Sequence, residues 1–94
     1  MILIFKGQYG STIDLHAYRE IQGFEFVNPP IEFRFVRGGL PISNWRPPAP
    51  GYVSLLHPVV AGPNVRTQGL DATNLAVETR GLGETFTLLV WPRE

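Results

Sequence analysis

Asp14 and His16 are the residues whose types and spacing come closest to a chemical site. A carboxylate and an imidazole two residues apart project from the same side of a strand, where they could hold a divalent metal or form an acid behind a general base. A third ligand or a nucleophile would have to come from His57 or Ser54. The alternative is that Asp14 and His16 belong to the solvated face of an amphipathic strand. We favour that alternative and predict no catalytic residue, no metal site and no cofactor.

Other motifs do not change this expectation. The glycines at 38–39 and 81–83 match neither a phosphate-binding loop nor a dinucleotide fingerprint, and neither opens a helix. Phe33, Arg34 and Phe35 could stack bases, but the two phenylalanines share a face with Ile31 and are expected in the core. Eight basic residues balance eight acidic ones, so the chain lacks the net positive charge typical of nucleic-acid binding. We therefore predict no nucleic-acid partner.

The composition describes a single small domain, residues 1–94, that tends to associate. Charged residues are 17% of the chain, against roughly 25% in ordinary soluble domains, and the formal net charge is zero. A protein of this kind lacks the self-repulsion that keeps copies apart in solution. It has no cysteine, so it must fold by packing alone. A neutral monomer with many loop glycines and prolines is the alternative.

The first residues suggest no targeting or membrane segment. Residues 1–5 are apolar, but no basic region precedes them and the run breaks at Lys6 and Gly7. It is too short for a signal sequence or a membrane span, and we interpret it as a first strand. No membrane partner is expected, and the compartment stays open, with a virion as one candidate.

Alternation of apolar and polar residues predicts an all-β protein. The fold class we expect is a compact antiparallel β-sandwich or barrel of about seven or eight short strands, with a proline-rich arm inserted mid-chain. In 70–80 a helix capped by Asp71 is the alternative, but valine and threonine favour a strand. The expected strand segments are 1–5, 12–18, 24–27, 31–36, 52–56, 70–80 and 84–91, and 65–68 could form a brief additional one. Residues 59–61 are a short apolar run closed by a turn signal at 62–64.

The connections predicted between these strands are mostly local. The first two strands are expected to pair as a hairpin, and 52–56 is expected to end at His57 and Pro58. Segments 24–27 and 31–36 flank Asn28, Pro29 and Pro30, so they form either a hairpin with a stiff corner or one long edge strand bent at the prolines. We favour the corner, with Asn28 extended because it precedes a proline.

The arm, residues 38–51, is the predicted interface. Its prolines lack the N–H donor and hold φ near −65°, so it cannot continue a sheet. Three alternatives are open: it packs on its own domain, it docks on another subunit, or its P-x-x-P spacing is read by an adaptor domain. The residues predicted to make this interface are Leu40, Pro41, Ile42, Trp45, Arg46, Pro47, Pro48 and Pro50.

By elimination, these features favour a non-enzymatic structural or interaction module. It would belong to a larger symmetric assembly and grip neighbouring protein subunits, including copies of itself. Small cysteine-free β domains of this general kind occur as phage capsid decoration, cement and tail-associated proteins, so a virion is the expected setting. The alternative is a small β-barrel or sandwich that binds a peptide, a glycan or a small molecule. Surface aromatics for that purpose would be Tyr9, Tyr18, Tyr52 and Trp91.

Overall fold

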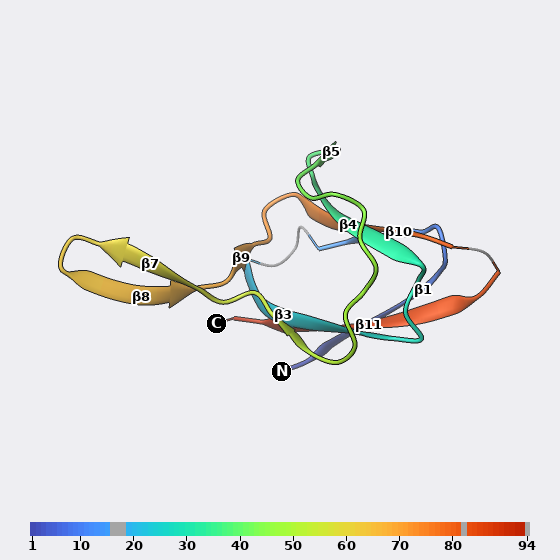
Figure 1. The fold of residues 1–94 in the computed structure, drawn as a ribbon, viewed down its shortest axis with the longest axis horizontal. Coiled ribbons are helices and arrows are strands. Elements are labelled where there is room, and N and C mark those ends of the chain that lie inside the picture. Colours follow the sequence, from blue (N-terminus) through green and yellow to red (C-terminus); the bar gives the residue numbers. More distant parts are fainter. Residues whose placement is uncertain (16–18, 82, 94) are drawn as a thin grey trace.

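Each segment predicted as a strand contains one in the structure. The computed structural model describes residues 1–15, 19–81 and 83–93, and within those ranges it has strands and no helix. All the strand pairs are antiparallel (Figure 1). The all-β prediction is therefore confirmed. Eleven strands occur in the described residues rather than seven or eight, because β5 and β7 form outside the predicted strands and the segment 70–80 divides into β9 and β10.

The larger sheet, sheet A, is five-stranded. Its order is β1-β11-β3-β6, and β9 also pairs with β3. A register shift between Trp91 and Pro92 bends β3 opposite Gln22, which lets Ile21 and Phe24 both face inward. The strands of sheet A are β1 (Leu3–Gln8), β11 (Thr85–Pro92), β3 (Glu20–Val27), β6 (Val53–Ser54) and β9 (Leu70–Asp71).

The second sheet, sheet B, is four-stranded and has the order β2-β10-β4-β5. Leu75 and Val77 of its central strand are buried, and Phe33 of the neighbouring strand is 4% exposed. The opposite faces of these strands carry charged side chains. The strands are β2 (Thr12–Asp14), β10 (Leu75–Arg80), β4 (Glu32–Arg37) and β5 (Leu40–Pro41).

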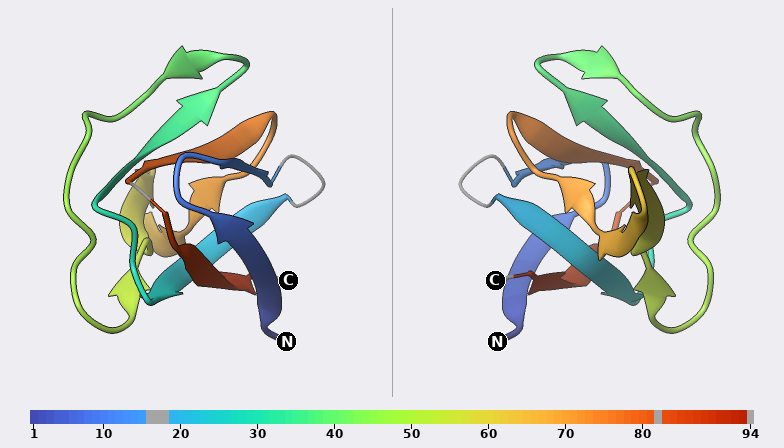
Figure 2. Two further views of the ribbon diagram at one scale, coloured as in Figure 1. Left: turned by 90° about the vertical axis from the view of Figure 1, so that its right-hand side faces the viewer. Right: turned by 90° about the vertical axis from the view of Figure 1, so that its left-hand side faces the viewer.

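Sheets A and B pack against one another across a shared core (Figure 2). The centre of this core is aromatic. The ring of Phe24 in sheet A lies 5.6 Å from that of Phe33 in sheet B, and the ring of Phe26 lies 5.2 Å from Phe33. Phe86 and Phe35 complete the cluster, in mostly edge-to-face contacts. Such contacts add to the hydrophobic stabilisation from burial itself. Neither sheet closes on itself.

A third, two-stranded sheet stands apart from this core. β7 (His57–Ala61) and β8 (Asn64–Gln68) pair only with each other among the described strands. Gly62 has a φ of 63° in the two-residue turn, a conformation that glycine adopts readily. The hairpin extends away from the two-layer body and lengthens the molecule to 51 × 26 × 23 Å (Figure 1).

The predicted pairing of the first two strands is wrong. β1 pairs with β11 in sheet A, while β2 pairs with β10 in sheet B. The chain crosses between the sheets at residues 9–11, and a Cβ on Gly7 would lie 2.8 Å from the hydroxyl oxygen of Ser11. The crossing places the apolar faces of the two strands on opposite walls of one core, whereas a hairpin would keep both in the same wall.

The predicted hairpin of 24–27 with 31–36 is also wrong, although a corner does lie between them. β3 belongs to sheet A and β4 to sheet B, so residues 28–31 connect the layers. Asn28 has a φ of 53° and is not extended, since asparagine tolerates the left-handed region. The hydroxyl of Tyr9 donates to the carbonyl oxygen of Pro29 at 2.7 Å and holds this corner.

The strand predicted in 52–56 does end before His57 and Pro58, but these two residues begin a new strand instead of only closing the previous one. Both residues lie in β7, where Pro58 is opposite Thr67. A hairpin has two free edges, so a proline can occupy a strand position there without removing a ladder hydrogen bond. In 70–80 the strand prediction is confirmed. The Asp71 carboxylate, considered above as a helix cap, instead accepts hydrogen bonds from the N–H and hydroxyl of Thr73.

Candidate interaction surfaces

The residues considered for catalysis are dispersed over separate sheets. Asp14 lies in β2 of sheet B, Ser54 in β6 of sheet A, and His57 at the start of the two-stranded sheet. His16 lies outside the described residues. Within the described part of the chain no three histidine, aspartate or glutamate side chains are grouped so that they could hold a metal ion. The Nδ1 atom of His57 lies 3.3 Å from the carbonyl oxygen of Leu55, two residues earlier in the chain.

Residues 40–46 lie along the edge of β4. β5 pairs with the end of β4, the N–H of Ile42 donates to the carbonyl oxygen of Phe35 at 2.9 Å, and the Ser43 hydroxyl accepts from the Phe35 N–H. Further along, Arg46 and Phe33 exchange backbone hydrogen bonds of 2.9 and 3.0 Å. This half of the predicted arm therefore bonds to its own domain, which is the first of the three alternatives.

Trp45 packs on the outer face of sheet B. Its ring centroid lies 4.5 Å from the guanidinium carbon of Arg34 and 4.3 Å from that of Arg80. These arginines are paired across β4 and β10 with the carboxylates of Glu78 and Glu32, at 2.6 and 2.5 Å. An indole ring over two guanidinium groups adds cation–π attraction. Trp45 and the ion pairs beneath it therefore stabilise this face of sheet B through contacts within the same chain.

The rest of the predicted interface is mostly exposed. Leu40 is 72% exposed and Ile42 47%, and Pro48 is half-buried. Residues 47–52 run down one side of the molecule from sheet B to sheet A (Figure 2). Beneath them lies a cavity of about 140 Å³ between the sheets, lined by Phe24, Phe33, Phe35, Arg46, Pro47, Ala49, Val53 and Leu55.

The β7–β8 hairpin exposes an apolar pair. Val60 and Val65 are directly opposite in the register and are 71% and 67% exposed. Side chains directly opposite in an antiparallel pair lie on the same face, so the two valines form one apolar spot near the turn. A two-stranded hairpin alone is marginally stable in water. Its exposed valines and two free edges are features of a segment that gains stability by contact with another surface.

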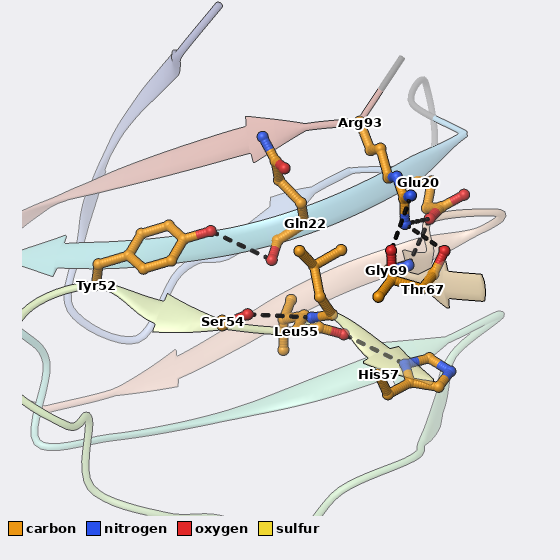
Figure 3. A network of polar contacts seen from close by, with 10 residues as sticks. Glu20, Gln22, Tyr52, Ser54, Leu55, His57, Thr67, Gly69 and Arg93 are labelled. Carbon is orange, nitrogen blue, oxygen red and sulfur yellow. Dashed lines mark hydrogen bonds and ion pairs between the residues drawn. The ribbon is translucent and has the colours of Figure 1, made fainter. Parts of the chain in front are cut away.

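The root of the hairpin is braced by a polar network (Figure 3). Arg93 donates to the carbonyl oxygen of Thr67 at 2.7 Å and to its hydroxyl at 3.1 Å, and also pairs with Glu20 at 3.4 Å. The Glu20 carboxylate accepts a hydrogen bond from the N–H of Gly69. On the other strand, the N–H of Leu55 donates to the carbonyl oxygen of Gln22. These bonds fix the direction in which the hairpin leaves the body.

The outer face of sheet A carries apolar and charged side chains together, since Lys6 of β1 and Glu25 of β3 share it with Ile4 and Leu89. Ile4 is 63% exposed and lies opposite Leu89 of β11, whose side chain is half-buried. Trp91 is next on the same face and meets Tyr52 edge to face, with ring centroids 4.8 Å apart. Tyr52 lies across Gly23, where an added Cβ would be 2.1 Å from its hydroxyl oxygen. The missing side chain of Gly23 makes room for this aromatic pair.

Tyr9, considered above for ligand binding, packs against its own domain. Its ring stacks near Phe86, and burial together with the neighbouring Glu84 carboxylate raises the pKa of its phenol above 10.0. Tyr18 lies outside the described residues. Of the aromatics considered for ligand binding, only Tyr52 and Trp91 are brought together in the described structure.

Sequence reasoning missed two of these surfaces. The hairpin was signalled by two short apolar runs around Gly62, Pro63 and Asn64, yet local patterns cannot show that a hairpin leaves the body. The outer face of sheet A was signalled by the loss of alternation at Leu88, Leu89 and Val90, which is typical of a strand covered on both faces.

Comparison with protein families, curated proteins and solved structures gives no match for this chain. Among the described residues there is no helix with the length and apolar character needed to cross a membrane.

Proposed function

We propose that this protein is a non-enzymatic interaction module of a larger symmetric assembly and grips neighbouring subunits with its β7–β8 hairpin. The observation that carries the proposal is the projecting hairpin with Val60 and Val65 exposed near its turn. A braced root and an apolar tip suit insertion into a neighbour, because little conformational entropy is lost when a pre-positioned segment docks.

The exposed part of the 38–51 segment is proposed as a second contact. Leu40 and Ile42 are exposed on the edge of sheet B, at the end of the body that carries β5. For the fold we propose the sandwich alternative with 38–51 as its arm, since sheets A and B have separate strand orders and each leaves its edges open. A phage particle, with this chain as a decoration or tail-associated protein, is the assembly we propose from its size and neutral, cysteine-free composition.

The test combines solution mass with hydrogen exchange. We expect the protein to form species heavier than its 10.5 kDa chain, in which the amides of 57–68 exchange slowly. The double variant Val60→Ser, Val65→Ser should shift the solution mass toward lighter species and exchange these amides quickly. The matched control is Ile31→Ser, which removes a side chain of similar exposure from the corner between the sheets. Fast exchange of 57–68 in the assembled species would refute the proposal.

A second candidate function is favoured by the Tyr52 and Trp91 pair. Two aromatic rings held edge to face on an open sheet form a surface on which a sugar ring or a peptide side chain can pack. Under this alternative the protein is a monomeric binding domain. Titration with oligosaccharides and peptides should then change the Trp91 fluorescence in a Trp45→Phe background, and Tyr52→Ala should abolish the change.

A further inference from the structure

We propose that β1 is a self-association strand: two copies of this chain pair their β1 strands antiparallel across a two-fold axis at Ile4, which joins two copies of sheet A. This inference is independent of the hairpin contact proposed above. It assigns a second copy of the chain to a part of the surface that the hairpin does not use.

The edges of the two sheets differ in length. β1 is a sheet edge of six residues and pairs only with β11 among the described strands. The other edge strands are short: β6 and β5 have two residues each, and β2 has three. A long edge presents a row of backbone donors and acceptors to any strand that approaches it. β1 is therefore the place where a further strand can add most hydrogen bonds.

The side chains of β1 do little to block such pairing. Natural edges are protected by charges, prolines or bulges. β1 contains no proline, and Lys6 is its only charged residue. Ile4 is 63% exposed, and Ile2, just before the strand, is 49% exposed. Ile4 and its cross-strand neighbour Leu89 form an apolar strip that a second copy would extend.

The occupant that fits this edge is another copy of the same strand. In an antiparallel pair, residues directly opposite each other point to the same face, so a two-fold arrangement places one residue opposite itself. An axis at Lys6 would put two ammonium groups face to face, which is destabilising. An axis at Ile4 puts isoleucine against isoleucine and sets Lys6 beside Ile2 of the other copy. Because the net charge of the chain is zero, no overall electrostatic repulsion between two copies opposes this contact.

The lack of cysteine makes the register directly testable. Residues directly opposite have Cα atoms about 4.5 to 5.5 Å apart, within the range of a disulfide. Ile4→Cys should therefore form a covalent dimer under mild oxidation. Lys6→Cys is the matched control. With the axis at Ile4, position 6 of one copy lies opposite position 2 of the other, so the two introduced sulfurs are four residues, or about 13 Å, apart along the strand. We expect Ile4→Cys to cross-link about tenfold faster than Lys6→Cys, a factor that corresponds to ~1.4 kcal/mol.

A third variant, Val60→Cys, reports random collisions and pairing through the hairpin, since the Val60 side chain is 71% exposed. Cross-linking that is fastest for Lys6→Cys or Val60→Cys would overturn the proposal, as it would place the contact in another register or on the hairpin.

Sedimentation supplies the non-covalent test. Wild-type protein should show a species of twice 10.5 kDa, and Ile4→Lys should raise its dissociation constant by about tenfold or more. Ile31→Lys, a similarly exposed position outside β1, should leave the dimer intact, and near-UV circular dichroism checks that both variants fold. A wild-type monomer at all concentrations, or a dimer unchanged by Ile4→Lys, would refute the proposal. Cross-linking of Ile4→Cys that persists in the hairpin double variant, together with fast exchange of the 57–68 amides in the assembled wild-type protein, would refute the proposed function alone.

Discussion

The outer faces of the two sheets are built in opposite ways. On sheet B, ion pairs link β4 to β10, and Trp45 from the same chain lies over Arg34 and Arg80. On sheet A, the corresponding face carries the exposed Ile4 and the half-buried Leu89 beside Lys6 and Glu25. The face of sheet B is thus partly covered by a ring from its own chain, whereas Ile4 on sheet A stays in water.

The physical basis of this difference is solvation. The arginine and glutamate side chains of sheet B are only partly buried, so their ion pairs contribute modestly and need no partner. Covering an exposed apolar side chain with another surface lowers the free energy by roughly 25 cal/mol for each Å² of apolar area removed from water. Sheet A is therefore the side on which association is expected.

The largest predicted effect lies in the core that both faces share. Phe33→Ala removes a ring that is 4% exposed and contacts Phe24 and Phe26, so it should destabilise the protein by about 3–5 kcal/mol. Urea unfolding followed by tryptophan fluorescence and by far-UV circular dichroism should give coincident curves, since both sheets depend on this cluster. Ile31→Ala, at a position 61% exposed, should change stability by less than about 0.5 kcal/mol. Separate transitions for the two probes would contradict a common core.

Trp45→Ala tests the covered face. Loss of two cation–π contacts, each about 0.5–1 kcal/mol, should reduce the free energy of unfolding by about 1–2 kcal/mol, with solution mass unchanged. Leu40→Ala is the control, because Leu40 is 72% exposed. If Trp45→Ala weakens association and leaves stability intact, Trp45 is an interface anchor, as the sequence predicted, and the contrast between the two faces fails.

Gly23→Ala tests the aromatic pair on the open face. The new methyl group would displace the Tyr52 ring, whose far end can swing away, so the expected loss is that of one aromatic contact, about 0.5–1.5 kcal/mol. In a Trp45→Phe background the Trp91 emission should shift. Combining Gly23→Ala with Tyr52→Ala should add nothing further, because both changes remove the same contact. Additive effects in this cycle would show that Gly23 has another role.

The smallest effect is expected at Asp71, in the connection between the sheets. Hydrogen bonds from the Thr73 hydroxyl and N–H, followed by the charge of Arg37, lower the pKa of the Asp71 carboxyl below its ordinary value of 3.8. A carboxyl whose folded-state pKa is depressed stabilises the protein above pH 3.8, and this contribution is lost as the pH falls through the lower folded-state value. The urea midpoint of Asp71→Asn should therefore depend less on pH in this acidic range than that of the wild type. Thr73→Val, which keeps only the backbone bond, should lie between the two, and equal slopes for all three proteins would contradict this account.

Local pattern was sufficient to place the strands. Ile13 and Leu15 alternate with Thr12 and Asp14 as expected, and Thr79 and Val77 face inward in the segment for which a helix was the alternative. Residues 16–18, where the second strand was predicted to continue, lie outside the described part. The predicted interface was located less accurately from the sequence. Residues 40–46 were predicted to grip a neighbour, but their backbone bonds go to β4 of the same domain.

Antiparallel strands, an aromatic core and few charges could be predicted from the amino-acid sequence, because side-chain alternation and composition are local properties. The pairing of the strands could not, and it is known only from the fold. β1 bonds to β11 and β3 crosses to a different sheet from β4, because ladder hydrogen bonds are chemically alike in every strand and long-range packing selects among them. The tertiary structure also decided which apolar side chains stay in water. Ile4 and Val60 look like core residues in sequence, and they remain exposed because no other part of the described chain reaches the edge of sheet A or the tip of the hairpin.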